Sequence, residues 1–488
     1  MAIFMITLPL LGAVLVSIVG YLKPHWLPWG ALVPLLASGV LGCMLIGRIP
    51  SDGYISYHLG NWSVPLGIEL RVDYLALFLM LLICALGLLA LIFSRRYIVK
   101  EVSAGRMTAY YVLILLLSGG LMGFVASGDI FNLFVFMEIV ALSSYGLVAI
   151  SANSRAVRAA LRYLLMGAPA SIIILLGIAL LYMATGSLNM AELAGRIGQS
   201  GYREILIASF VLFVVGFGVK AALFPLHLWL PDAHSIAPSP VSALLSGLVV
   251  EVSIFGILRI AYSVFTPHVG NLTSATSNAL AVLAAAGVIF GGVMALLQKD
   301  LKLMLAYSTI SHVGYIFLGL TAFNAEGLTG AMYHMLDHGL AKACMFLCAG
   351  SFIYIKGFRR IEDLKGAWRQ MPWTCFAFGL AAFSLVGIPP TAGFISKWYL
   401  ILGNVKAGNW VYVVVLLLGS LLGAFYCFRI LYYMFFQPGK EGAWTPRPAD
   451  VPPSMLIPIW ILAVATVFFG LFSGLVIPSL LKAAGLLI

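Results

Sequence analysis

Long apolar runs, separated by short charged or glycine- and proline-containing stretches, fill almost the whole chain. Most runs are about 20 residues long, the length that a helix needs to cross the hydrocarbon core of a bilayer. The runs are continuous, whereas the strands of a membrane β-barrel alternate apolar and polar residues. The pattern predicts an all-α polytopic membrane protein with about 14 transmembrane helices. The predicted spans lie near residues 2–22, 28–47, 73–94, 108–127, 130–150, 161–184, 205–230, 241–265, 277–297, 302–322, 326–355, 371–403, 410–436 and 455–479.

The composition excludes a soluble enzyme. Of the 488 residues, 62% are hydrophobic and only 9% are charged, and the mean hydropathy is +1.06. An ordinary soluble domain carries about 25% charged residues, which it needs to cover its surface. The six cysteines all lie in or beside apolar runs, so we interpret them as small buried hydrophobic residues rather than disulfide or metal-binding residues.

The net charge of +11 comes from basic residues in the loops between the spans, so it does not indicate a nucleic-acid-binding surface. Loops after even-numbered spans hold few basic residues: Arg48, Arg71, Arg196, Arg203 and Lys406. Loops after odd-numbered spans hold many more, among them Arg95, Arg96, Lys100, Arg106, Arg155, Arg158, Arg162, Lys299, Lys302, Lys356, Arg359, Arg360, Lys365, Arg369, Lys440 and Arg447. This bias predicts that the odd loops are cytoplasmic and that both termini lie on the outer side of the cell's inner (cytoplasmic) membrane. The polar stretch 48–72 is then an external hairpin or loop.

An internal repeat appears when the chain is shifted on itself by 171 residues, which aligns residues 160–193 with 331–364. The same shift brings together two spans that are interrupted by proline, at Pro225 and at Pro389-Pro390. Because the shift covers five spans, an odd number, the two copies must have opposite orientations in the membrane. Inverted repeats with broken helices near the midplane are typical of ion and solute translocation.

Several ionisable residues fall inside the apolar spans, where each charge costs roughly 2.5–3.5 kcal/mol on insertion scales. Two arginines near span ends, Arg259 and Arg429, can reach the interface. Six other groups are candidates for a functional role: Glu138, Lys220, Glu251, Asp337, Lys342 and Lys397. A broken helix exposes carbonyls that protein or water must satisfy, so a lysine beside the break implies a hydrated pocket. Lys220 and Lys397 both lie near such a break.

The histidines add titratable groups to this set. His334, His338 and Lys342 are spaced by four residues, so they form one stripe of a helix, as a proton wire requires. His312 in the preceding span extends this row. His227 and His234 follow the first break, where they either carry protons or cap the backbone. A heme held by two histidines needs them on opposite sides of the iron, and no zinc motif is present, so we expect neither a cofactor nor a metal.

The motifs SGDIFNLFVFMEI, KAALFPLHLWLPDAHSIAPSPVSALLSG, LAYSTISHVGY, HMLDHGLAKACMFL and GIPPTAGFISKW resemble those of one superfamily. It comprises the antiporter-like subunits of respiratory complex I, the D-type subunits of Mrp-type cation/proton antiporters and the matching subunits of membrane-bound energy-converting hydrogenases. The resemblance implies fourteen helices, with inverted five-helix repeats at helices 4–8 and 9–13 and broken helices 7 and 12. It also implies proton-translocation roles for Glu138, Lys220, His334, His338, Lys342 and Lys397. The SGDIFNLFVF and SPVSALLSG motifs are similar to the D-type branch.

Two residues depart from the pattern of the superfamily. Glu251 stands where relatives have a lysine or histidine, and Asp337 stands where an asparagine is common. We expect Glu251 either to hold a lysine, Lys220 or Lys342, in its charged state, or to titrate itself as a proton carrier. A carboxylate is also an oxygen ligand for a hard cation, so a sodium site is a further alternative.

The sequence therefore predicts a proton-translocating subunit of a multisubunit membrane complex, with Na⁺/H⁺ exchange left open. Its partners would be other membrane subunits, including related antiporter-like ones, together with protons and lipid. A quinone- or heme-binding redox subunit and a stand-alone secondary transporter remain as alternatives. The predicted organisation is residues 1–107 for the first three helices, 108–265 and 266–436 for the two repeats, and 437–488 for the last loop and helix.

Overall fold

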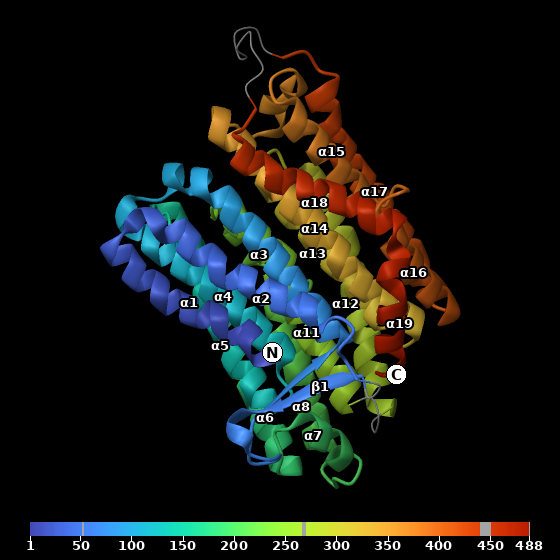
Figure 1. Ribbon diagram of the computed structural model, residues 1–488. Coiled ribbons are helices and arrows are strands. Elements are labelled where there is room, and N and C mark those ends of the chain that lie inside the picture. The colour runs from blue at the N-terminus through green and yellow to red at the C-terminus, as the bar shows by residue number, and fades with distance from the viewer. Residues whose placement is uncertain (51–52, 266–269, 440–449, 488) are drawn as a thin grey trace.

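The computed structural model describes residues 1–50, 53–265, 270–439 and 450–487. In this part, the chain is a bundle of long helices with one small two-stranded sheet toward one end (Figure 1). Two basic loop residues of the sequence analysis, Lys440 and Arg447, lie outside the described residues, as do positions 51–52 of the predicted external loop and 266–269 of the predicted second repeat.

The helices follow one another with short connections. The first half contains α1 (Ala2–Leu22), α2 (Leu27–Leu45), α3 (Tyr74–Glu101), α4 (Met107–Ala126), α5 (Ile130–Ala149), α6 (Ser154–Thr185), α7 (Met190–Ile197), α8 (Arg203–Lys220), α9 (Leu230–Ile236), α10 (Ser239–Leu244) and α11 (Val250–Ile260). Single π-helical turns, Leu245–Val249 and Ala261–Phe265, connect α10 to α11 and extend α11. The second half contains α12 (Gly270–Leu297), α13 (Leu301–Leu320), α14 (Ala325–Lys356), α15 (Pro372–Val386), α16 (Ala392–Lys406), α17 (Trp410–Phe435), α18 (Pro453–Leu471) and α19 (Ile477–Gly485).

Each of the fourteen predicted spans coincides with a helix or with a pair of helices. In the described residues, twelve helical stretches are long and apolar enough to cross a membrane. The two predicted spans that are not among these twelve are 205–230 and 371–403. The first contains α8 followed by an irregular stretch that reaches the start of α9, and the second is divided between α15 and α16. The prediction of a polytopic helical membrane protein is thus confirmed. An internal proline alone does not interrupt a span, because α1, α2, α6 and α18 contain Pro9, Pro34, Pro169 and Pro458 and stay continuous.

At both breaks, buried side chains donate hydrogen bonds to carbonyls at the helix ends. After α8 ends at Lys220, the indole Nε1 of Trp229 donates a hydrogen bond to the carbonyl of Val219 at 2.7 Å. After α15 ends, the Nζ of Lys397 donates to the carbonyls of Leu385 and Val386, at 3.0 and 2.9 Å. Carbonyls at membrane depth must find such donors because lipid offers none.

The predicted external segment 48–72 contains an antiparallel hairpin, β1 (Tyr54–His58) and β2 (Glu69–Asp73). Both chain ends lie near this hairpin in Figure 1. Near the C-terminus, the ammonium of Lys482 contacts the hydroxyl of Tyr74 at 3.4 Å. The two termini therefore lie at the same end of the bundle, as an even number of membrane crossings requires.

The internal repeat of the sequence recurs as a repeat of backbone contacts. Asp129 forms an antiparallel bridge with Asn189, and 171 residues later Asp300 forms one with Arg360. Asp129 and Asp300 also cap the helices that follow them, α5 and α13. The backbone bonds around each bridge have the same offset: Ile130 N to Leu188 O and Met190 N to Gly128 O, then Leu301 N to Arg359 O and Ile361 N to Lys299 O.

The two copies of this contact lie at opposite ends of the bundle. The first leads directly into α7, at the lower end in Figure 1, and the second leads toward α15, at the upper end. Gly186 and Gly357, which end α6 and α14, are also 171 residues apart and both have a φ of 70°, a left-handed conformation that favours glycine. This opposite placement supports the inverted orientation that the sequence predicts.

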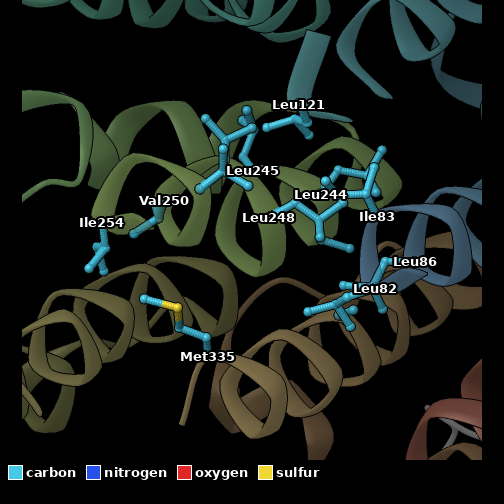
Figure 2. Packing of buried hydrophobic residues seen from close by; sticks show 14 of the residues in the cluster. Leu82, Ile83, Leu86, Leu121, Leu244, Leu245, Leu248, Val250, Ile254 and Met335 are labelled. Carbon is cyan, nitrogen blue, oxygen red and sulfur yellow. The ribbon is translucent and has the colours of Figure 1, made fainter. Parts of the chain in front are cut away.

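The centre of the bundle is closely packed where α10 and the π-helical turn Leu245–Val249 cross α3 and α14 (Figure 2). Figure 2 shows leucines of α3 and of the π-helical turn facing one another, with Met335 of α14 nearby. A Cβ atom on Gly247 would lie 2.9 Å from the carbonyl oxygen of Gly339, so these glycines allow the two backbones to approach. Gly247 lies one turn before Glu251, and Gly339 follows His338, so this contact positions both side chains.

Two loop assignments of the sequence analysis are wrong. Arg155 and Arg158 lie in the first two turns of α6, which begins at Ser154, seven residues before the predicted span. Lys302 lies in α13 and is buried, and its ammonium donates to the carbonyl of Ala237 at the end of α9. In both cases a helix extends beyond the apolar run, because a capping residue, Asn153 or Asp300, starts it earlier.

Candidate functional site

The first predicted pair, Glu138 and Lys220, is brought together by α5 and α8. The Nζ of Lys220 lies 3.8 Å from Oε1 of Glu138, and the hydroxyl of Ser171 on α6 donates to the same carboxylate oxygen. The side chain of Lys220 is 6% exposed and that of Glu138 is 34% exposed. The ammonium has no hydrogen-bond partner among the described residues. Lys220 is therefore held by charge more than by hydrogen bonds, and the contact can open at little geometric cost.

The chain from the end of α8 through α9 carries two of the secondary candidates, His227 before α9 and His234 within it. His227 is buried against the rings of Phe224 and Phe290, with centroids at 5.5 and 5.1 Å. His234 is completely buried, and within the described residues neither of its ring nitrogens has a hydrogen-bond partner. Burying a polar ring without a hydrogen-bond partner is energetically costly, which sets His234 apart from a histidine that caps the backbone.

Glu251 lies deep in the bundle and faces His338. Its carboxylate Oε1 contacts the Nδ1 of His338, and both side chains are essentially inaccessible. The other carboxylate oxygen and the Nε2 of His338 have no partner in the described part of the chain. One of our two expectations was that Glu251 holds Lys220 or Lys342, but in the structure its partner is His338 of α14. The other expectation, that Glu251 itself carries a proton, stays a prediction.

The predicted histidine row continues from α14 to α13. The Nδ1 of His312 lies 2.9 Å from the Nε2 of His334, and their rings stack with an interplanar angle of 8°. The Nδ1 of His334 lies 2.9 Å from the hydroxyl of Ser396 on α16. His312 also stacks on His338, with centroids 5.3 Å apart. The three histidines thus form one cluster that reaches from Glu251 to α16.

Lys342 occupies the other end of the stripe on α14. It is completely buried, and its ammonium donates to the carbonyl of Leu305 at 2.8 Å and to the hydroxyl of Ser308. Both acceptors belong to α13. Lys342 therefore faces the interior of the bundle and has no carboxylate partner among the described residues.

Lys397 and Asp337 lie on either side of the second break. Lys397 is 7% exposed, and its ammonium lies 4.9 Å from the centroid of the Tyr315 ring in addition to its two carbonyl acceptors. Asp337 accepts a hydrogen bond of 2.5 Å from Ser384, and its second oxygen has no partner in the described residues. The lysine of the second break is thus held by α15 carbonyls, whereas the lysine of the first break is held by a carboxylate.

The arginines near the helix ends differ from the row. Arg259 pairs with Asp73, which caps α3 beside the hairpin. Burial acts to raise the pKa of the Asp73 carboxyl, but the charge and hydrogen bond of Arg259 outweigh it and hold the pKa below its usual value. Arg429 donates to carbonyls at the end of α12, with a 2.6 Å bond to Gln298. Both arginines therefore bind the end of a neighbouring helix and are not part of the buried row.

Sequence reasoning missed the hydroxyl side chains that connect the row. They are Ser171, Ser308, Ser384 and Ser396, joined by Tyr315. Serines are common in membrane helices, so the sequence carries no signal that separates these from the many serines that bond only to their own helix. Lys302 was also missed, although it lies two residues after the capping residue Asp300, a position that places it inside the helix.

The ionisable side chains of the row thus lie inside the bundle in two groups. The Glu138–Lys220 pair is one, and the cluster of Glu251 with the three histidines, together with Lys342 and Lys397, is the other. The family described as "NADH:quinone oxidoreductase/Mrp antiporter, TM" matches residues 127–423, which include every side chain of the row. The chain belongs to this family. No cluster of three or more potential metal ligands occurs in the described residues.

The relatives come from both branches of the family. The N-type subunit of the NADH-quinone oxidoreductase of Desulforudis audaxviator is 41% identical over 464 residues, covering 93% of this chain and 91% of the relative. The D-type subunit of the Na⁺/H⁺ antiporter of Alkalihalophilus pseudofirmus is 33% identical, covering 88% and 87%. A chain of the membrane-bound sulfane sulfur reductase, an archaeal respiratory membrane complex, superposes with a TM-score of 0.92 at 32% identity and covers 99% of this chain and 97% of its own. The comparisons therefore do not favour the D-type branch that the SGDIFNLFVF motif suggested.

Proposed function

We propose that this chain is a proton-translocating subunit of a multisubunit membrane complex. One observation carries the proposal: Glu251, His338, His334, His312, Lys342 and Lys397 are buried ionisable groups inside the bundle, and the partly exposed Glu138 pairs with buried Lys220 at the first broken helix. Charges are expensive at membrane depth and are retained where they move ions. The names of the relatives, all subunits of multisubunit complexes, support the same function.

The two halves of the row are suited to different steps. On the first side, Glu138 and Lys220 can move apart without breaking a hydrogen bond to the ammonium. A second charge that arrives nearby can therefore separate the two side chains. On the second side, Lys397 sits among carbonyls of the broken helix, which accept hydrogen bonds from its charged form. The cluster of Glu251, His338, His334 and His312 would transfer protons between the halves, because each group lies within contact of the next.

The same arrangement disfavours the redox alternatives. The ring nitrogens of His312 and His334 are 2.9 Å apart and bond to each other, so no iron fits between them. His338 bonds to Glu251. A stand-alone transporter is disfavoured by the relatives, whose names place them in complexes.

Exchange of Na⁺ for protons is a second candidate function. It is favoured by the 33% identical relative from a Na⁺/H⁺ antiporter and by two buried carboxylates, Glu251 and Asp337, each of which has one oxygen without a partner in the described chain. Oxygen ligands are the ones that hard cations prefer. We propose the inner (cytoplasmic) membrane as the location, with both termini outside, and other antiporter-like subunits as the partners.

Lys397 offers the test, because its helix also carries a matched control. In proteoliposomes that contain the complete complex and an internal pH-sensitive dye, Lys397→Ala should lower proton movement at least tenfold. Lys406→Ala removes the same charge from the end of α16, where the lysine pairs with Glu326 at the surface, and should leave the rate within about twofold. Equal rates for wild type and Lys397→Ala would rule out the proposed role, and a rate that changes with internal Na⁺ would support the exchange function.

A further inference from the structure

A basic cavity lies at one end of the bundle, away from the proton row. It has a volume of about 600 Å³ and is formed where α3 and α14 end and where α2 and α18 begin. Its polar lining includes Arg95, Arg96, Lys100 and Ser454. Because four membrane helices start or end here, the cavity lies at the level where a bilayer has its headgroups.

The three basic side chains have no acidic partner among the residues that the structure describes. Within the described residues, no carboxylate lies within ion-pairing distance of Arg95, Arg96 or Lys100, since every ion pair of that part involves other residues. The nearest acid in sequence, Glu101, accepts a 2.7 Å hydrogen bond from the buried hydroxyl of Tyr97 instead. Three unpaired cations around one cavity favour an anionic ligand.

Aromatic rings hold two of the cations in place. The guanidinium carbon of Arg95 lies 4.4 Å from the centroid of the Trp29 ring. The ammonium of Lys100 lies 3.7 Å from the centroid of Tyr354 and donates to the carbonyl of the same residue at 3.1 Å. Side chains held by cation–π contacts lose less freedom when a ligand binds, so the site is partly preorganised.

A further donor faces the same space. The hydroxyl of Ser454 is buried and has no hydrogen-bond partner in the described chain, although it lines the cavity. Ser454 lies in the first turn of α18, where Pro453 has no N–H and the N–H groups of Met455 and Leu456 bond to the carbonyl of Pro452. The N–H group that this turn can add to the lining is therefore that of Ser454. Hydroxyl, N–H and guanidinium groups together match the oxygens of a phosphate ester.

An apolar stripe leads from the cavity along the membrane face of α2. Trp29, Val33, Leu36 and Val40 follow one another at helical spacing, and all are about half exposed or more, at 48%, 64%, 56% and 52%. In a membrane protein such a stripe contacts acyl chains. The stripe begins at the residue that stacks on Arg95, so a headgroup in the cavity can continue into chains along α2.

We propose that this cavity binds the phosphate headgroup of an anionic diacyl phospholipid, with its acyl chains along the α2 stripe. A free phosphate would use the same donors but would not need the stripe. An acidic segment of a partner subunit would use the charges but not the lipid-facing helix. The stripe and the headgroup-level position together favour the lipid, and basic pockets between membrane helices are a known way to bind such headgroups.

The test is lipid binding by the full chain in its purified complex, measured by native mass spectrometry. The probe is dioleoyl-phosphatidylglycerol, with dioleoyl-phosphatidylcholine as the zwitterionic control. The double variant Arg95→Gln/Arg96→Gln should bind phosphatidylglycerol about 25-fold more weakly, about fivefold for each charge removed. The matched control Arg155→Gln/Arg158→Gln removes two exposed arginines from the start of α6 and should bind like the wild type.

Each of the remaining outcomes would overturn or support the proposal. If both double variants lose the same amount of phosphatidylglycerol binding, the lipid is attracted by general surface charge, and the proposal is wrong. Inorganic phosphate that displaces phosphatidylglycerol at equal concentration would identify a free phosphate instead. If the isolated chain binds the lipid and the complete complex does not, a partner covers the cavity and the proposal fails. If the glutamine variant does not fold, Val99→Asp places a negative charge on an exposed lining residue and must abolish binding in the same way.

Discussion

Replacing Glu138 with glutamine tests the electrostatic pair at the entrance of the row. Glutamine keeps the size of the side chain and an oxygen that can accept the hydrogen bond from Ser171, but it removes the negative charge that faces Lys220. If the pair is a switch, the charged form of Lys220 loses its stabilising partner and the cycle stalls. A purely structural pair would lower stability without a specific loss of transport.

The distance sets the size of the effect. Two unit charges 3.8 Å apart attract by about 4 kcal/mol at an effective dielectric constant of about 20. Because Glu138 is 34% exposed, water screens part of this attraction. Each 1.4 kcal/mol corresponds to about a factor of ten in rate, so we expect Glu138→Gln to lower proton transport at least tenfold.

Proton uptake into proteoliposomes, driven by an imposed membrane potential, is the assay. The control Glu192→Gln breaks a surface ion pair of α7, in which Glu192 lies 3.1 Å from Arg196, and should change the rate less than twofold. A double-mutant cycle with Lys220→Ala then measures the coupling. If the two substitutions act independently, or if Glu138→Gln transports like the wild type, the switching pair is refuted.

Three further predictions concern other parts of the chain. Glu251→Gln removes the charge that faces His338 and should lower proton transport at least tenfold; unchanged transport together with unchanged Na⁺ dependence would make Glu251 structural. Asp73→Asn keeps the helix cap but leaves Arg259 unpaired, and should destabilise the protein by about 3 kcal/mol near neutral pH. Because folding lowers the pKa of Asp73, the stability that its charge contributes is complete above about pH 5 and is lost as the pH falls. The difference in thermal stability between wild type and Asp73→Asn should therefore shrink toward about pH 3. A difference that stays constant with pH would contradict the pairing of Asp73 with Arg259. Gly393→Ala would place a Cβ 1.7 Å from a backbone carbonyl oxygen of α15. It should lower the free energy of unfolding by about 1–3 kcal/mol in a denaturation assay. An unchanged denaturation midpoint would show instead that α15 and α16 can move apart.

Hydrophobic runs predict the helices well because lipid leaves few alternatives. A span must be apolar, about 20 residues long and internally hydrogen-bonded, so each run maps onto a helix. The helix starts at Asn153 and Asp300 lie outside the apolar runs, and there the sequence was wrong: capping places Arg155 and Lys302 on helices. Capping residues, unlike apolar runs, are too common to fix a boundary alone.

The site was predicted as a set of residues but only partly as a set of contacts. The contact of Glu138 with Lys220 follows from the resemblance, and the alignment of His334, His338 and Lys342 follows from helical spacing. The partner of Glu251 depends on the packing of α11 on α14, which no local pattern specifies. Long-range contacts of this kind require the fold itself.

Proton flux through Lys342→Met tests the central claim most directly, because this buried lysine of α14 lies beside the histidine cluster and far from solvent. The matched control is Lys356→Met, which removes the same charge at the end of the same helix. With the complete complex in proteoliposomes, proton transport should fall at least tenfold in Lys342→Met and stay within twofold of the wild type in Lys356→Met. Wild-type flux in both variants, with the complex assembled, would contradict a proton path through the buried row.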